Sequence, residues 1–270
     1  MRQQNKKSKF VAFLLSLLLV CTMMPQLAWA TGGTLEGEGT ANAPYQISDV
    51  ADLKAFRDKV NGGATSIHAK LMDNINLNNE AWTPISNVSA IASAFAGTFD
   101  GNGKTISGLS ISTSKSNQGL FGLINGATIK NLKVEGTVYS TKSYVGGIVG
   151  KNKGEVRECS ASGEIHGELS VGGIAGENNG FLAECRNEAD VNTEYEEKKQ
   201  ELSDIDTDAA AILEKYRISK ENTERSNLTY TDIGGVVGFS DGGVQGCDNY
   251  GEVGYPHVGY NIGGVAGRQS

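Results

Sequence analysis

The chain has 270 residues, and 36 of them are glycine, about 13% where roughly 7% is usual. Because glycine inside a helix costs about 1 kcal/mol relative to alanine, this composition excludes a long helical bundle. The aliphatic content is too high for a disordered linker and too discontinuous for a membrane protein. Three histidines and four cysteines provide little material for catalysis. A glycine-rich, turn-dense β protein remains.

The first thirty residues have the pattern of a secretory signal peptide. Four basic residues precede the apolar run Phe10–Val20, and Ala28-Trp29-Ala30 supplies small residues at the cleavage positions. The run is too short for a transmembrane span, and the Leu-Leu-Val before Cys21 lacks the small residue that lipoprotein processing expects. We therefore predict a signal peptide at residues 1–30 and no membrane span after its cleavage.

Removal of this segment leaves 20 basic against 31 acidic residues, a net charge of −11. Binding to phosphate requires a basic face, so a nucleic-acid partner is disfavoured. The sequence therefore predicts a secreted, extracellular or bacterial cell-surface protein.

Residues 31–112 are predicted to form an N-terminal cap and irregular first coils. Pro44 to Ile47 reads as a short strand, and a helix begins at Asp49 and ends at Gly62-Gly63. Its apolar stripe consists of Val50, Leu53, Phe56 and Val60. The coils are expected at His68–Leu77, Trp82–Ile85, Phe95–Phe99 and Lys104–Ile111, with a tight turn at Asp100–Gly103.

Residues 113–270 contain an internal repeat. VGGIVG begins at Val145, VGGIAG at Val171, IGGVVG at Ile233 and IGGVAG at Ile262, and GLFG at Gly119 is an earlier variant. The four hexamers are spaced 26, 62 and 29 residues apart, and Cys159, Cys185 and Cys247 repeat the first two spacings. Such a period indicates stacked units that cannot bury an apolar face alone.

The residues after each cysteine alternate between apolar or small and polar side chains, which predicts strands with one inward face. Stacking one such strand per copy gives a parallel β-helix. The Gly-Gly pairs are expected to supply positive φ at the corners. A leucine-rich repeat is excluded because its L-x-x-L-x-L frame is absent.

Several segments of the chain form a specific combination: the lead-in GEGTANAPYQISDVADLKAFRDKVNGG, then WTPI and FAGTFDGNGKTISGL, and then GLFG and the VGGIVG elements. In this combination the chain resembles bacterial proteins with GLUG motifs. The resemblance covers nearly all of Leu35 to Gly267. It implies that the parallel β-helix is right-handed, so the predicted fold is an all-β, right-handed parallel β-helix, to which the residues add an N-terminal capping helix. It also implies an exported, adhesin-like protein or the non-catalytic part of an IgA-protease-like protein, without catalytic residues in the motif.

The departure from this pattern is a charged insertion, predicted to be helical over residues 194–228. The 62-residue gap exceeds a period of 26 by 36 residues, so we expect the segment to leave and rejoin the same coil. A solvated amphipathic excursion is favoured over a partner-binding arm.

Three cysteines remain in the mature chain. We expect Cys159, Cys185 and Cys247 to be buried thiols in one column, since equivalent side chains on successive coils are parallel and poorly placed for bridging. A disulfide is the second interpretation and a zinc site the third, because no CxxC or HxxxH pattern accompanies them.

One column of carboxylates is a weak candidate metal site. Glu164, Asp190 and Glu252 share the outward position before an inward aliphatic residue. Like charges this close repel one another, and a divalent cation would relieve the repulsion. A solubilising acidic edge is the favoured interpretation.

The sequence thus predicts a non-catalytic surface module for adhesion, ligand binding or a structural stalk, with no catalytic residues and no cofactor. Its partner would be a host or cell-surface protein or glycan. The alternative is the N-terminal accessory region of a secreted protease or polysaccharide-active enzyme. The last copy stops at Ser270 before its strand, so we expect further sequence beyond it and self-association through that end.

Overall fold

A computed structural model describes residues 35–193, 232–254 and 261–270, all within the unit Gly33–Ser270. The predicted signal peptide at 1–30 and the predicted helical insertion at 194–228 lie outside the described residues. One α-helix, α2 (Val50–Asn61), and one 3₁₀ turn, η1 (Ile91–Ser93), accompany the strands among the described residues.

The strands carry the rest of the regular structure. Before the repeats they are β1 (Tyr45–Ile47), β2 (Ala69–Leu71), β3 (Ile75–Asn76) and β4 (Thr98–Thr113). The next are β5 (Phe121–Ser140), β6 (Val145–Gly146), β7 (Val149–Arg157), β8 (Ser160–His166), β9 (Val171–Gly172), β10 (Ala175–Asn178), β11 (Phe181–Ala183) and β12 (Arg186–Val191). The last are β13 (Asp232–Gly234), β14 (Val237–Ser240), β15 (Gly243–Gln245), β16 (Asp248–Asn249), β17 (Asn261–Gly263) and β18 (Ala266–Gln269).

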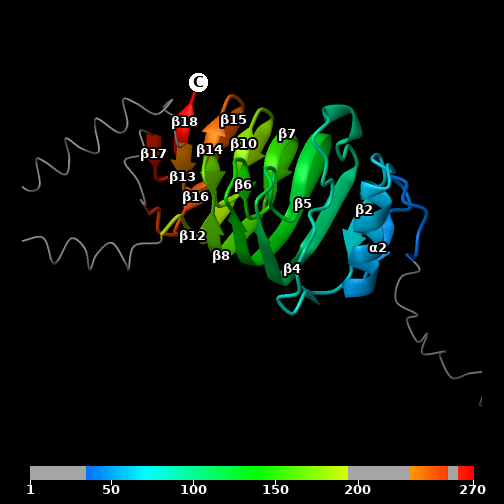
Figure 1. Ribbon diagram of the computed structural model, residues 1–270. Helices are drawn as coiled ribbons and strands as arrows, with labels where there is room; N and C mark the ends of the chain where they lie inside the picture. Colours follow the sequence, from blue (N-terminus) through cyan, green and yellow to red (C-terminus); the bar gives the residue numbers. More distant parts are fainter. Residues whose placement is uncertain (1–34, 194–231, 255–260) are drawn as a thin grey trace, which may run out of the picture. The chain divides into compact units, whose positions relative to one another are not determined.

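These strands form the predicted parallel β-solenoid. The main sheet has 14 strands, and its path β1-β2-β4-β5-β7-β10-β14-β18 places successive coils side by side in chain order (Figure 1). A second sheet has four strands in the order β17-β13-β9-β6. Every pair of named strands is parallel.

The register confirms the repeat that was read from the sequence. The first residues of the four hexamers are direct partners, since Val145 pairs with Val171, Val171 with Ile233, and Ile233 with Ile262. The earlier GLFG variant joins the same stack through Phe121, which pairs with Val149. One sequence copy therefore corresponds to one coil.

The predicted cap is present at the first coil. Asp49 is the N-cap of α2, and its Oδ1 accepts a hydrogen bond from the Asp52 amide at 2.9 Å. Leu53, Phe56 and Val60 are buried on one face, at the spacing expected of an amphipathic helix. The helix lies beside β2 at one end of the stack, where it covers apolar side chains of the first coils (Figure 1).

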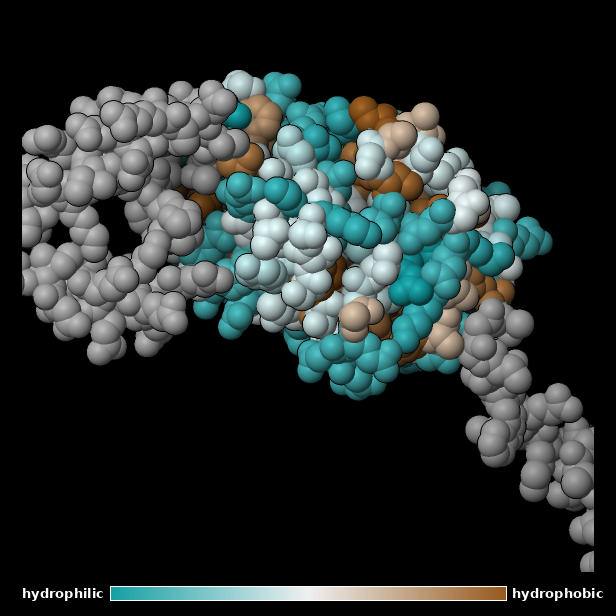
Figure 2. Space-filling model, in the orientation of Figure 1, coloured by the Kyte–Doolittle hydropathy of each residue, from teal (hydrophilic) through white to brown (hydrophobic). Residues whose placement is uncertain are grey.

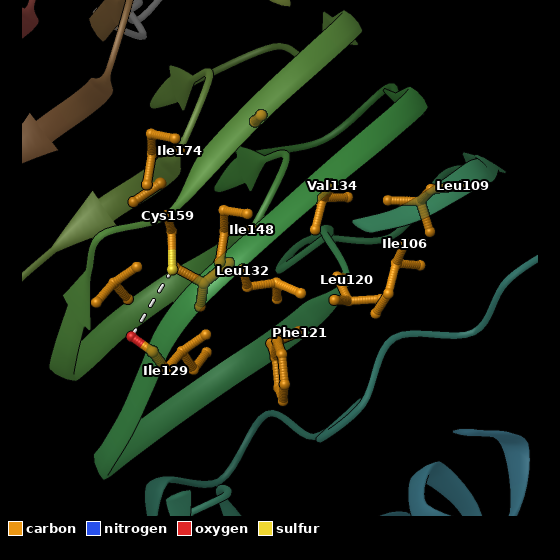
Figure 3. Close-up of a cluster of buried hydrophobic side chains, with 14 of the residues drawn as sticks. Ile106, Leu109, Leu120, Phe121, Ile129, Leu132, Val134, Ile148, Cys159 and Ile174 are labelled. Atoms are coloured by element: carbon orange, nitrogen blue, oxygen red, sulfur yellow. Dashed lines mark hydrogen bonds between the residues drawn. The ribbon is translucent and has the colours of Figure 1, made fainter. Parts of the chain in front are cut away.

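The interior is a continuous apolar core. Side chains from successive coils meet inside the solenoid, as Figure 3 shows for Phe121, Leu132, Ile148 and Ile174. All four are at most 2% exposed. Since each coil is too small to bury its own apolar face, stacking supplies the burial that stabilises the fold.

The paired glycines act through close approach, and the prediction that they supply positive φ is wrong. Positive φ is absent at Gly146, Gly147, Gly172 and Gly173. A Cβ on Gly147 would lie 2.7 Å from the Gly173 carbonyl oxygen, and one on Gly173 would overlap the Asn187 side chain. Left-handed residues recur at two equivalent positions of successive coils, one set at Asn131, Glu158, Glu184 and Gly246 and the other, just before the Gly-Gly elements, at Asn117, Tyr144 and Ser170.

The region between β3 and β5 is more regular than predicted. Residues 104–111, expected as an irregular coil, belong to the 16-residue strand β4. The expected tight turn at Asp100–Gly103 lies inside that strand, where the pairing with β5 shifts register between Asp100 and Lys104. Asn102 and Gly103 have φ of 52° and 72°, so the chain bends there without leaving the ladder.

The excess length of the 62-residue repeat falls at one corner. Ile165 pairs with Val191, and Val171 pairs with Ile233. The chain takes 6 residues from Ile165 to Val171 and 42 from Val191 to Ile233, an excess of 36. The strands on both sides keep their register, which agrees with an insertion that leaves and rejoins one coil.

Candidate functional site

The outward strand face is an array of polar side chains on β5, β8, β12 and the segment from β16 to Val253. Parallel pairing aligns these segments residue by residue, and successive side chains alternate between core and solvent. The face consists of Lys133, Glu135, Thr137, Tyr139, Ser160, Ser162, Glu164, His166, Arg186, Glu188, Asp190, Asp248, Tyr250 and Glu252.

The predicted acidic column lies on this face. Glu164 and Asp190 are register partners, and the next coil places Glu252 beside Asp190, whose Oδ1 accepts a hydrogen bond from the Glu252 amide at 2.9 Å. Glu164 Oε2 lies 3.8 Å from His166 Nε2. Across residues 35–193, 232–254 and 261–270, no group of three His, Cys, Asp or Glu side chains is arranged to hold a metal ion.

Two exposed tyrosines, which the sequence analysis did not single out, extend the face. Tyr250 is 64% exposed, and the Arg186 guanidinium carbon lies 4.4 Å from its ring centroid. Tyr139 is 39% exposed, and its ring centroid is 6.2 Å from that of His166. Both tyrosines occupy outward positions of the two-residue alternation, which was the available signal.

One basic group of the face contacts two of its neighbours. Arg186 Nη1 lies 3.4 Å from Glu188 Oε1 while the same side chain covers Tyr250. Much of the surface visible in Figure 2 is hydrophilic or intermediate, with smaller hydrophobic areas between. Carboxylates, hydroxyls and aromatic rings in one plane can accept hydrogen bonds and stack on a ligand without any buried cavity.

The predicted cysteine column is the second candidate. Cys159, Cys185 and Cys247 are free thiols on successive coils, each preceding the register partners Ser160, Arg186 and Asp248. Cys159 and Cys185 are buried, as predicted. Cys247 is only half-buried, so the prediction of three inaccessible thiols is wrong for this residue. It lies on a coil where Gln245, Gly246 and Asp248 are exposed.

The environments of the three thiols differ in their effect on acidity. Burial raises the pKa of Cys159 to about 12. The hydrogen bond between the two side chains raises the pKa of Cys185 and lowers that of Cys247, and burial raises the pKa of Cys185 further. Partial burial and the neighbouring Asp248 oppose the lowering at Cys247. Among the described residues, Cys247 is therefore the thiol that ionises most readily.

The described helices include none that is long and apolar enough to span a bilayer. The expectation of no membrane span after signal cleavage concerns the whole mature chain, and residues 194–231 and 255–260 lie outside this finding.

Comparison with known proteins supports the GLUG resemblance. Residues 142–165 match the model of the GLUG motif, and they span one hexamer, the following corner and Cys159. The chain is 34% identical over 140 residues to halomucin from Haloquadratum walsbyi (strain DSM 16790 / HBSQ001), which covers 48% of this chain and 2% of halomucin. The chain thus corresponds to a small part of that protein.

A solved structure has the same fold. The crystal structure of a candidate immunoglobulin A1 protease from Bacteroides ovatus matches with a TM-score of 0.62 and 18% identity, covering 87% of this chain and 64% of that one. At this identity the match concerns the fold alone. The chain is thus a parallel β-solenoid in which residues 142–165 match the GLUG motif, and the register places the equivalent hexamers of the other copies on successive coils.

Proposed function

We propose that the chain is a non-catalytic module of an exported or cell-surface protein, which binds a ligand through the outward strand face. The observation that carries this proposal is the exposure of Tyr139 and Tyr250 on the array that holds the acidic column. Large aromatic side chains that remain exposed beside polar groups are typical of recognition surfaces.

The construction of the coils supports a surface role. Inward positions of β8 and β12 are filled by Ala161, Ile165, Ala189 and Val191, all at most 2% exposed. The side chains that differ in charge and polarity from coil to coil are therefore the outward ones. A repeat built in this way provides a rigid support on which outward residues can differ from coil to coil.

The ligand class follows from the chemistry of the face. Carboxylates and tyrosines suit a glycan or a protein with basic side chains, and the net charge of the mature chain disfavours nucleic acid. The name halomucin and the GLUG motif are compatible with a surface or secreted protein, which is the localisation that we propose.

A second candidate is an accessory region of a secreted protease or polysaccharide-active enzyme. The likeness to the candidate immunoglobulin A1 protease from Bacteroides ovatus favours it, because the shared fold covers 64% of that chain. In that case the face would orient a substrate for a catalytic part outside this sequence.

Binding arrays would test the proposal. Residues 31–270 would be applied to immobilised glycans and host surface proteins, beside a reducing-sugar release assay. We expect saturable binding that Tyr250→Ala weakens by roughly tenfold or more, since exposed aromatic anchors dominate interfaces. Ile91→Ala, at a 47% exposed residue off the face, should bind as the parent does. Sugar release without tight binding, or binding unchanged by Tyr250→Ala and Tyr139→Ala, would contradict the proposal.

A further inference from the structure

The cysteine column contains two stacked pairs with the same geometry and different access. Cys159 precedes Ser160 and Cys185 precedes Arg186, which are register partners, and Asp248 after Cys247 pairs with Arg186 in the same way. Cys159 and Cys185 are 2% and 1% exposed, whereas Cys247 is half-buried. An external reagent can therefore reach the Cys185–Cys247 pair, through Cys247, and cannot reach the Cys159–Cys185 pair directly.

The Cys185–Cys247 pair is also in direct contact. The Cys185 backbone N–H donates to Cys247 Sγ at 3.4 Å, and Cys247 Sγ donates to the Gln245 carbonyl oxygen at 3.4 Å. Neighbouring parallel strands are about 4.8 Å apart, and disulfides join Cα atoms separated by about 4.4–6.8 Å. A bond between the two sulfurs therefore requires side-chain rotation and little backbone movement.

The contacts favour Cys247 as the attacking sulfur. A thiolate there accepts a hydrogen bond from a backbone amide and faces a thiol that can donate to it. Asp248 is the charged group that opposes its ionisation. Cys185 has no comparable access, since it lies inside the coil between Cys159 and Cys247.

We propose that Cys247 and Cys185 form a site of thiol–disulfide exchange with low-molecular-weight disulfides, in which Cys247 is the nucleophile and Cys185 the resolving thiol. The Cys247 thiolate attacks one sulfur of the disulfide, breaking its S–S bond, and the released thiolate takes up a proton. Cys185 then loses its proton and attacks Cys247 Sγ, releasing the second small thiol. Two protein thiols become one disulfide while one small disulfide is reduced to two thiols.

The product would join two successive coils across the longest repeat spacing, 62 residues. This chemistry goes beyond ligand binding by the outward strand face, because it uses the sulfur column at the neighbouring corner. It would make the association of the β15–β16 coil with the preceding coil dependent on the redox state of the surroundings.

The test is a time course of the mature chain, residues 31–270, with oxidised glutathione, followed by peptide mapping in a mass spectrometer. We expect a glutathione adduct on Cys247 that appears first and is replaced by a Cys185–Cys247 crosslink. Cys159 should remain a free thiol that is alkylated only after denaturation. Because burial limits attack, Cys159 should react roughly a hundredfold more slowly than Cys247 in the native protein.

Variants separate the two roles. Cys247→Ser should abolish the reaction of the native chain, and Cys185→Ser should retain the glutathione adduct on Cys247. Cys159→Ser is the matched control, since it removes the buried thiol and should still form the crosslink. Should Cys185→Ser not fold, Cys185→Ala and the order of products in the parent time course provide the same information.

Several outcomes would overturn the proposal. These are no reaction at Cys247 in the native chain, a persistent adduct without the crosslink, or a crosslink that involves Cys159. Failure of the glycan and protein arrays would leave this result unaffected, so the two proposals are tested separately.

Discussion

The capped end and the repeated coils of this solenoid fill their interiors with different side chains. Near α2 the core is a cluster of rings, in which Phe56, Phe95, Phe99 and Phe121 lie 5.3–5.9 Å apart between centroids. From β7 onward the interior holds stacked aliphatic residues, glycines and amides. The first arrangement joins a helix to a sheet, whereas the second can be repeated coil after coil.

Amide side chains connect the repeated coils through their interior. Asn152 Nδ2 donates to Asn178 Oδ1 at 2.7 Å, and Asn178 Nδ2 donates to Ser240 Oγ at 3.0 Å. Asn152 and Asn178 also accept the backbone N–H of Gly154 and Gly180. We call Asn152, Asn178 and Ser240 the amide ladder. Each of the two asparagines hydrogen-bonds to the backbone of its own corner and to the equivalent side chain of the next coil.

The largest effect should come from the ring cluster. Phe121→Ala removes a fully buried side chain that contacts two other rings, so the free energy of unfolding should fall by about 3–5 kcal/mol. Urea denaturation followed by circular dichroism would measure it. Ile91→Ala, in η1 and 47% exposed, should change stability by less than about 0.5 kcal/mol. A loss below about 1 kcal/mol for Phe121→Ala would show that the cap does not depend on the rings.

The amide ladder should give the next largest loss. Asn178→Ala removes the acceptor of the Gly180 amide and the nearer acceptor of Asn152 Nδ2, which keeps the Phe181 carbonyl oxygen at 3.3 Å, at an expected cost of about 2–3 kcal/mol. Asn179→Ala is the control, because its Oδ1 has no partner. A double-mutant cycle with Ser240→Ala should reveal coupling of about 0.5–3 kcal/mol. Additive losses would mean that the coils are stabilised independently.

Glycine contact in the repeated coils can be tested at Gly173. A Cβ there would overlap the Asn187 side chain and lie 2.5 Å from the Gly235 carbonyl oxygen, so Gly173→Ala should cost about 1–3 kcal/mol. Gly264→Ala makes the same change in the last hexamer, where nothing lies within 4 Å of the added atom. Equal thermal midpoints for the two variants would refute close approach as the reason for the Gly-Gly pairs.

The smallest effect concerns the carboxylate of Asp100, which lies where β4 pairs with β5. Burial raises the pKa of Asp100, but hydrogen bonds from the Asn102 amide and Asn131 and the charge of Lys130 outweigh it, so its pKa lies below 3.8. The folded pKa is depressed, so the stabilisation is present above the unfolded pKa and lost as pH falls through the folded value. Asp100→Asn should therefore flatten the acid side of a plot of urea midpoint against pH. An unchanged plot would exclude this carboxylate from the acid response.

The stacking could be predicted because its markers repeat. Cys159, Cys185 and the hexamers share one spacing, and only equivalent positions on successive coils satisfy all of them. The amide ladder has the same signal in Asn152-Lys-Gly154, Asn178-Asn-Gly180 and Ser240-Asp-Gly242, although the prediction did not use it. The ring cluster has no such signal, because Phe56 comes from α2 and Phe95 and Phe99 precede the repeats, and Phe121 alone occupies a repeat position, in GLFG.

The candidate site was less predictable for a physical reason. Inward residues pack against the equivalent residue of the neighbouring coil. An aliphatic residue at Ile165 therefore predicts another at its register partner, Val191. Outward residues such as Tyr139 and Tyr250 meet solvent, and nothing in the repeat fixes their identity. The positions of the acidic column followed from the alternation. The partial exposure of Cys247 did not, because it depends on the packing around the β15–β16 coil, where Gln245, Gly246 and Asp248 are also exposed.

The pairing of each coil with the next determines how the molecule would grow. One copy uses 26 residues and advances the stack by one strand spacing, about 4.8 Å, whereas the same residues fully extended would span roughly 86 Å. Adding copies is therefore an inefficient way to gain distance and an effective way to enlarge a flat surface by one row of side chains. A polymeric ligand lying across those rows would gain affinity through multivalency as rows are added.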